Sequence, residues 1–447
     1  MTLLDSPHIH RLTGDVIAAG HGTAAQQGDP AAAAGWRALE KMICLVVLFL
    51  LGSREIFKGG LTFGACAALL LCPIWIGVLR RYRHAGLLFA CTALTLVNGL
   101  VLAAFAGHEH RYASFSSVLD DSTLWIGTLA AVGVVLWSRT VASLSSIGLA
   151  YGLGLLVHNL AHPDLLAPTN PWKFVYSFPV AIVALGIASR HRSRVASLLV
   201  LLALAAISAV LDSRSLFGSL LFAAVLLGWQ LRPRISVKPL AWGWTLVLVC
   251  GLGAAIYNLM TALMLEGALG TEIQHRSQQQ VQAAGSLLLG GRPELAATLA
   301  LMRHDPAGFG VGVAPNIYDV MAAKSGMIEI NYNPNFNGYV DRYMFGGHVE
   351  LHSTAGDLWA LFGIGGLLTG CAVMLVAVRG LSHSMSARAG NGLLAFVVCQ
   401  TLWDLPFSPL YSSIPTLILT LGLGLTVNRG HIPTGHDRNH TQDAPGR

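Results

Sequence analysis

The chain has 447 residues, of which 54% are hydrophobic and only 11% are charged, and its mean hydropathy is +0.59. Soluble domains carry about 25% charged residues, so this composition excludes an ordinary water-soluble protein and predicts an integral membrane protein. The formal net charge of +6 does not indicate nucleic-acid binding, because the basic residues stand in short clusters between apolar runs, as at Arg190 and Arg194. Such clusters are signals of membrane topology.

The apolar runs predict an all-α polytopic membrane protein. Residues 1–36 are polar and lack the apolar region of a cleaved signal peptide, so we expect a disordered cytoplasmic tail there. A single transmembrane domain is expected over 37–428, followed by a second cytoplasmic tail over 429–447. About twelve transmembrane helices are predicted, near 38–53, 60–79, 86–107, 122–138, 141–160, 174–189, 195–211, 215–231, 240–265, 353–378, 391–407 and 411–428.

Basic residues are distributed unevenly between the two faces of this predicted bundle. With the N-terminus inside, the short inner loops carry twelve Lys or Arg residues and the short outer loops carry five. Since Lys and Arg are retained on the cytoplasmic side, both termini are expected in the cytoplasm. The long connection over 266–352, between spans 9 and 10, then lies outside.

The long outer connection is where we expect the chemistry of this protein, because loops of this length are usually functional or disordered. It is rich in Asn, Gly, Tyr and His. The stretch from Thr271 to Leu301 predicts one or two helices over the membrane surface, and Asn331 to Gly338 predicts an irregular turn. Gly308, Gly310 and Gly312 lack the strand and the Lys of a nucleotide-binding loop, so they predict tight backbone turns.

Two histidines stand at the end of this connection, in the sequence His348-Val-Glu350-Leu-His352. On a helix Glu350 would lie about 200° around the axis from His348, which argues against the HExxH zinc-protease motif. In an extended segment the three side chains would share a face and could bind a metal, although no fourth ligand is evident. Alternatively, a single histidine could act as a general base, since its unperturbed pKa lies near 6.5, and His352 at the mouth of the next span is the better candidate. A surface histidine without a role is the remaining interpretation.

Two further polar positions lie at predicted outer helix ends. The sequence Asp212-Ser213-Arg214 is either a turn whose arginine reaches to the membrane surface or a place where the planar guanidinium grips a phosphate. Asp404 is expected to cap a helix.

In their order along the chain, these segments resemble the O-antigen ligase and polymerase superfamily. The stretch GRPELAATLALMRHDPAGFGVG, from Gly291, is similar to the family's outer-loop signature of a small residue, Arg, any residue and Glu, followed by an apolar helix, Pro and Gly-x-Gly. The stretch HSTAGDLWALFGIGGLL is similar to the family's segment that opens with His and reaches Gly-x-x-Gly eleven residues later, here at Gly363 and Gly366. Ser213-Arg214 corresponds to a Ser-Arg pair at the start of a span. The chain departs from the family at Ser353, where Asn is frequent.

The resemblance implies a GT-C-like membrane glycosyltransferase of the bacterial inner membrane, with its active site facing the periplasm and no metal or other cofactor. Such an enzyme transfers a glycan from undecaprenyl pyrophosphate to an acceptor hydroxyl. By this resemblance His352 is the general base and Arg214 and Arg292 neutralise the pyrophosphate, with Arg276 and His348 as further substrate-binding candidates. An O-antigen ligase, whose acceptor is the lipid A-core, is favoured over a polymerase that joins repeat units on the carrier.

A transporter or flippase is the alternative from another functional class. A bundle of twelve spans permits it, but the sequence has no internal repeat, no matched pair of broken spans and few ionisable groups at mid-membrane depth. This alternative predicts that His352→Ala leaves function intact and that charged residues inside the spans matter instead.

Overall fold

The structure is a computed structural model that describes residues 30–58, 60–162, 170–191, 193–231, 242–268, 270–335, 338–386 and 390–428. Over these residues the chain is predominantly α-helical, as expected, apart from two short two-stranded pairings. Most of both predicted tails, 1–29 and 429–447, lies outside the described residues. Residues 30–36, expected in the N-terminal tail, already belong to the first helix, because Pro suits the first helical position and the alanines that follow it favour helix.

The helices of the bundle coincide with the apolar runs of the sequence. They are α1 (Pro30–Ser53), α2 (Phe63–Leu70), α3 (Cys72–Leu79), α4 (Ala85–Phe105), α5 (Phe115–Val141), α6 (Leu144–Ala161), α7 (Ser177–Arg190), α8 (Arg194–Val210), α9 (Arg214–Trp229), α10 (Trp242–Leu265), α15 (Thr354–Ser386), α16 (Gly392–Phe407) and α17 (Leu410–Gly424).

Five helical stretches among the described residues are long and apolar enough to cross a bilayer: Ala85–Glu109, Phe115–Val141, Leu144–Ala161, Trp172–Arg190 and Thr354–Met385. Shorter apolar helices accompany them, including α8, α9, α16 and α17. The fold is therefore that of an all-α membrane protein. The number of twelve spans stays a prediction.

The predicted span at 60–79 is not one helix. It consists of α2 and α3, which are preceded by a small hairpin of β1 (Ile56–Lys58) and β2 (Leu61–Thr62). Pro73 explains the break, because it has no N–H to donate to the preceding turn and its ring clashes with that turn. The apolar composition continues across this break, so hydropathy alone does not reveal it.

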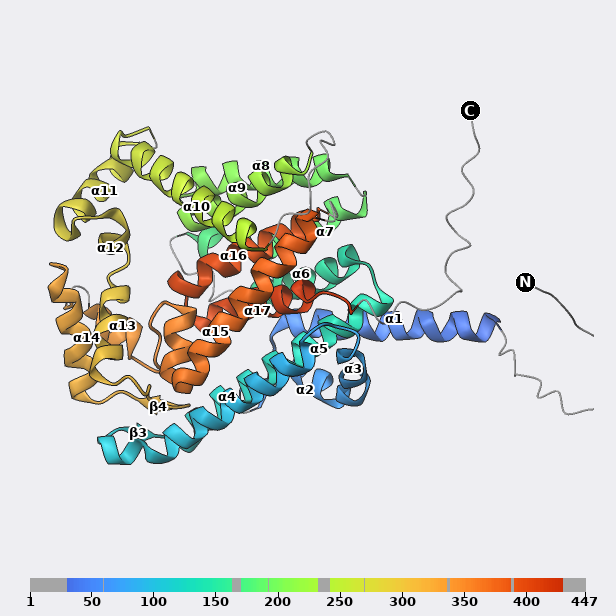
Figure 1. Ribbon diagram of the computed structural model, residues 1–447, viewed down its shortest axis with the longest axis horizontal. Coiled ribbons are helices and arrows are strands. Elements are labelled where there is room, and N and C mark those ends of the chain that lie inside the picture. The colour runs from blue at the N-terminus through green and yellow to red at the C-terminus, as the bar shows by residue number, and fades with distance from the viewer. Residues whose placement is uncertain are drawn as a thin grey trace, which may run out of the picture.

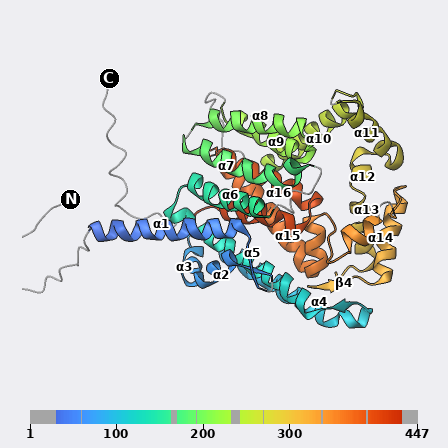
Figure 2. The same cartoon turned by 180° about the vertical axis from the view of Figure 1, so that it is seen from behind.

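The bundle has two chemically different ends. At the C-terminal end of α17, Arg139 donates from Nη1 to the carbonyls of Gly422 and Leu425 at 2.8 and 2.7 Å, and Tyr82 pairs with Val427. The helices between α10 and α15 gather at the opposite end, as Figures 1 and 2 show from two sides. The arginines of predicted inner loops and the predicted outer connection thus lie at opposite ends of the bundle.

The connection over 266–352, called the outer segment below, folds into a helical unit of its own. It contains α11 (Thr271–Ala284), α12 (Leu287–Gly291), α13 (Glu294–His304), β4 (Val313–Ala314), α14 (Ile317–Glu329) and the π-helical turn η5 (Val340–Met344). Three helices occupy the stretch where one or two were expected, and α14 was not expected. Asn331 to Asn335 has neither helix nor strand, as predicted, and residues 336–337 lie outside the described part. In Figure 1 the outer segment arches from α10 across to α4.

The three glycines at 308, 310 and 312 attach the outer segment to the bundle. All three have positive φ, and a Cβ on any of them would overlap the backbone of α15, α4 or α5, so the predicted tight turns are confirmed. Gly363 kinks α15, and the carbonyl of Ala360, in the turn before the kink, accepts hydrogen bonds from the N–H groups of Phe309 and Gly310 at 2.8 and 3.0 Å.

A network of buried ion pairs also attaches the outer segment to the bundle. Arg111 donates from Nε and Nη2 to both carboxylate oxygens of Asp319 at 2.8 and 2.7 Å, and from Nη1 to Asp305 at 2.6 Å. It lies beside β3 (Tyr112–Ala113), which pairs with β4. The loop after α4 is thereby bound to the end of α13 and to α14, which fixes the position of these two helices relative to α4.

Candidate active site

Three of the predicted site residues share one electrostatic environment. Arg214 begins α9, Arg276 lies on α11 and Arg292 follows α12, and all three guanidiniums interact electrostatically with the ammonium of Lys173. Lys173 belongs to the π-helical turn η3 (Trp172–Tyr176) at the start of α7. Lys173 therefore lies in the electrostatic field of three guanidiniums from three other elements and of the carboxylate of Asp212.

Arg214 is held in place but keeps donors unused. Its Nε donates to Oδ1 of Asp212 at 3.0 Å and its Nη1 approaches the sulfur of Met264 at 3.7 Å. Its Nη2 is buried and has no hydrogen-bond partner among the described residues. A buried donor without a partner costs free energy, so a ligand oxygen at this position would be favourable. The N-terminus of α9, where Arg214 lies, adds a partial positive charge.

His352 occupies a left-handed turn immediately before α15, with φ of 53°. Its Nδ1 lies 3.1 Å from the carbonyl oxygen of Glu350. Because a carbonyl can only accept, Nδ1 carries the proton in the neutral ring and Nε2 keeps its lone pair. Asp357 fixes this turn by accepting from the N–H of Leu351 at 2.6 Å and from that of Leu410 at 2.7 Å. The turn therefore presents a basic nitrogen in a fixed orientation.

Tyr339 and Glu294 connect His352 to the arginines. The ring of Tyr339 lies 6.0 Å from the imidazole of His352, and its hydroxyl donates to Oε1 of Glu294. Glu294 is 5% exposed, and its Oε2 is buried without a partner among the described residues. Burial and the carboxylate of Glu294 raise the pKa values of Tyr339 and Tyr332, so both phenols stay protonated. Arg292 acts electrostatically on Tyr339, in the direction that lowers its pKa.

Asp404 lies in the last turn of α16 and is also within the field of Arg292. It accepts a hydrogen bond from Nε2 of Gln400 at 2.8 Å and is hydrogen-bonded by the side chains of Ser408 and Thr416. These side-chain bonds tie the end of α16 to α17, but α17 begins after Pro409 without a side-chain cap, so the expected capping role of Asp404 is not observed among the described residues.

His348 belongs to a different group of side chains. Its ring stands edge-on to Tyr411 at 4.4 Å, and its Nε2 lies 3.3 Å from Oε2 of Glu350. Tyr411 in turn donates to Asp121 at 2.8 Å. The hydrogen bond with Glu350 raises the pKa of His348 against the opposing effect of burial. The structure thus relates Arg214, Arg276 and Arg292 through their common influence on Lys173, places Tyr339 beside His352, and directs His348 toward α5 and α17.

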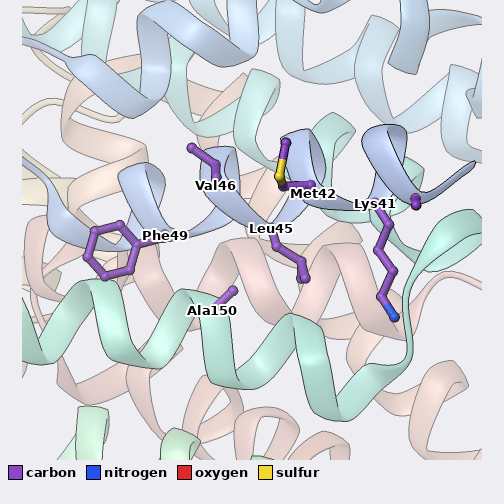
Figure 3. A pocket seen from close by; sticks show the side chains of 7 residues that line it. Lys41, Met42, Leu45, Val46, Phe49 and Ala150 are labelled. Atoms are coloured by element: carbon purple, nitrogen blue, oxygen red, sulfur yellow. The ribbon is translucent and has the colours of Figure 1, made fainter. Parts of the chain in front are cut away.

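Sequence reasoning missed Lys173, Tyr339 and the role of Glu294. Lys173 is one of the five cations of the predicted outer loops, and Glu294 is part of the Arg-x-Glu motif. Nothing in the sequence indicates that either residue belongs to the same site as His352. The apolar hollow of Figure 3 is not part of this site. It lies between α1 and α6, lined by Ala38, Lys41, Met42, Leu45, Val46, Phe49 and Ala150.

Comparison of the chain with protein-family models and with curated proteins finds no match.

Proposed function

We propose that this chain is a membrane glycosyltransferase that transfers a glycan from undecaprenyl pyrophosphate to a sugar hydroxyl, as an O-antigen ligase acting on the lipid A-core. The observation that carries the proposal is the shared electrostatic environment of Arg214, Arg276, Arg292 and Lys173, in a chain that also holds a histidine whose Nε2 is available as a base. The membrane-spanning character of the chain suits a polyprenyl carrier. The proposed location is the bacterial inner membrane, with the site facing the periplasm.

The cations would bind the pyrophosphate of the donor. Glycan transfer breaks the bond between the anomeric carbon and the phosphate oxygen, and the leaving undecaprenyl pyrophosphate takes the electron pair. The developing negative charge is stabilised by guanidinium donors, which match phosphate oxygens in a bidentate geometry. Arg214, with its unused Nη2, and Arg292, which acts electrostatically on Tyr339 and Asp404, are the two residues we assign to this contact.

His352 would remove the proton from the acceptor. As the acceptor oxygen bonds to the anomeric carbon, its proton passes to Nε2, and the imidazolium that results keeps its Nδ1–H on the carbonyl of Glu350. Tyr339 borders the same ring and is anchored by Glu294, so it limits how the imidazole can turn. Every proton and electron pair is accounted for by these groups without a metal ion.

The test is complementation of a bacterium that lacks its O-antigen ligase, read as the lipopolysaccharide ladder on a gel. The variants are His352→Ala, Arg214→Ala and Arg292→Ala, each checked for normal membrane abundance. Arg303→Ala is the matched control, because Arg303 also lies in the outer segment but is 73% exposed and forms a long ion pair with Glu329, at 3.7 Å. We expect the wild type and the control to restore the ladder and the three variants to fail.

Other outcomes would revise the proposal. If the wild type restores no ladder but rescues a strain defective in chain polymerisation, the chain is a polymerase that uses the same site. If His352→Ala and Arg214→Ala behave as the wild type in both strains, the assignment of the active site is wrong. If, in addition, charged residues inside the spans are required, the transporter alternative is correct.

A further inference from the structure

A second cluster of reactive side chains lies outside the candidate active site, where α1 and α6 end. Glu55 follows the end of α1, and His158 and His162 are separated by one helical turn at the end of α6. One ring nitrogen of each histidine and one carboxylate oxygen of Glu55 lie within 4.8 Å of one another. Among the described residues this is the group of His, Cys, Asp and Glu side chains that converges with metal-ligand spacing.

We propose that Glu55, His158 and His162 form a site for a zinc-class divalent cation. Oε1 of Glu55 lies 3.3 Å from Nδ1 of His158 and 3.6 Å from Nδ1 of His162. Ligand atoms in a tetrahedral zinc site are about 3.3 Å apart, so the three side chains need only small rotations to bind one ion. Two imidazoles and one carboxylate are a donor set that prefers Zn²⁺ to Mg²⁺ or Ca²⁺.

The tautomer of His162 determines which of its nitrogens is free to bind an ion. Its Nδ1 lies 2.9 Å from the backbone carbonyl of His158, which can only accept, so Nδ1 carries the proton and Nε2 keeps its lone pair. Metal-binding histidines are commonly oriented in this way, with the second ring nitrogen donating to a carbonyl. The rings of His158 and His162 lie 4.5 Å apart, centroid to centroid. The nitrogen of His162 that lies 3.6 Å from Glu55 is, however, the protonated Nδ1, so either Nδ1 releases its proton when the ion binds or the ring turns to bring Nε2 towards Glu55.

The surroundings leave room for an ion to enter. The side chain of His158 is 19% exposed, whereas those of Glu55 and His162 are 42% and 44% exposed, so a fourth position is open to water. Gly52 and Gly154 bring the backbones of α1 and α6 into contact one helical turn below the site, which fixes the distance between its two halves. The guanidinium of Arg54 acts electrostatically on His158, but its Nη2 donates to the carbonyl of Tyr411 at 3.4 Å.

This site is separate from the proposed glycosyl transfer. Its residues contact neither His352 nor the arginine group among the described interactions, and its position predicts a structural effect. A bound ion would join the outer ends of α1 and α6 and stabilise their packing. The inference therefore does not depend on the proposed function.

The test is zinc binding by the full-length chain in detergent, purified without a histidine tag and stripped with a chelator. We expect one Zn²⁺ per chain by calorimetry, with no competition from millimolar Mg²⁺ or Ca²⁺, and a rise in the unfolding temperature. Glu55→Gln, His158→Gln and His162→Gln should each weaken binding by at least about tenfold, because loss of even an outer-shell partner weakens metal affinity by about 10- to 100-fold.

The matched control is His108→Gln with His110→Gln, two exposed histidines at the turn after α4. This control should bind zinc as the wild type does. X-ray absorption of the loaded wild type should show two imidazole ligands. The proposal is overturned if the wild type binds no stoichiometric zinc, or if the control loses binding while the three site variants retain it. Unfolding without metal shows whether each variant is folded, so that lost binding cannot be mistaken for lost structure.

Discussion

Replacement of Tyr339 by Phe tests the geometry between Glu294 and His352. The hydroxyl of Tyr339 is the partner of Oε1 of Glu294, and Oε2 has none among the described residues. Tyr339→Phe therefore leaves a 5% exposed carboxylate without a donor. A hydrogen bond to a charged group contributes about 1.5–3 kcal/mol, so we expect the folding equilibrium constant to fall by about 10- to 150-fold.

The assay is equilibrium unfolding of the purified chain in detergent micelles across a denaturant series, followed by tryptophan fluorescence. Tyr343→Phe is the control, because Tyr343 stacks on Tyr339 at 5.6 Å but is 57% exposed. The double variant Tyr339→Phe with Glu294→Gln separates the pair from other effects, since removing the charge should recover part of the loss. If Tyr339→Phe costs no more than Tyr343→Phe, the two side chains do not form the bond on which this argument rests.

Three further predictions concern stability. Arg111→Met should lower the free energy of unfolding by about 3–5 kcal/mol in the same assay, because the fully buried carboxylate of Asp319 loses the guanidinium that pairs with it. Arg303→Met should leave the free energy of unfolding nearly unchanged, since Arg303 is exposed. The pKa of His348 is raised in the folded state, so its ion pair with Glu350 contributes fully to stability below the unfolded-state pKa of about 6.5. That contribution is lost as the pH rises through the folded-state pKa. His348→Gln should therefore lower the free energy of unfolding at about pH 6 and leave it nearly unchanged at about pH 9. Gly154→Leu should separate α1 from α6 and reduce stability and membrane abundance, since any Cβ at this position overlaps the backbone of α1.

Hydropathy was sufficient to locate the helices of the bundle, because long apolar runs are needed wherever a helix faces lipid. It was insufficient at 60–79, where Pro73 splits an apolar run into two helices. It also gave no indication of α14, whose composition is only weakly apolar and whose burial comes from packing inside the outer segment. The turns at Gly308 and Gly312 were predictable because glycine is favoured at positive φ whatever surrounds it.

The candidate site was only partly predictable for a related reason. Arg214, Arg292 and His352 could be selected because they stand at predicted helix ends in segments that resemble a family signature. Lys173 and Tyr339 could not, since they join the site through the packing of η3 and η5, which no periodicity in the sequence encodes. Their contribution becomes visible only when the distances and charges between elements are known.

The arrangement at this site is unfavourable for folding alone, which is an argument that it serves a ligand. Among the described residues, eight buried side-chain atoms have no hydrogen-bond partner, and the two that belong to ionisable side chains are Nη2 of Arg214 and Oε2 of Glu294. Arg214 belongs to the group of cations that act on Lys173, and Glu294 bonds Tyr339, on which Arg292 acts. Buried charged groups that lack hydrogen-bond partners are typical of functional sites, where local stability is given up for function. A bound diphosphate would give Arg214 its missing acceptor and reduce the repulsion, so binding of the proposed donor should stabilise the fold as well as begin the reaction.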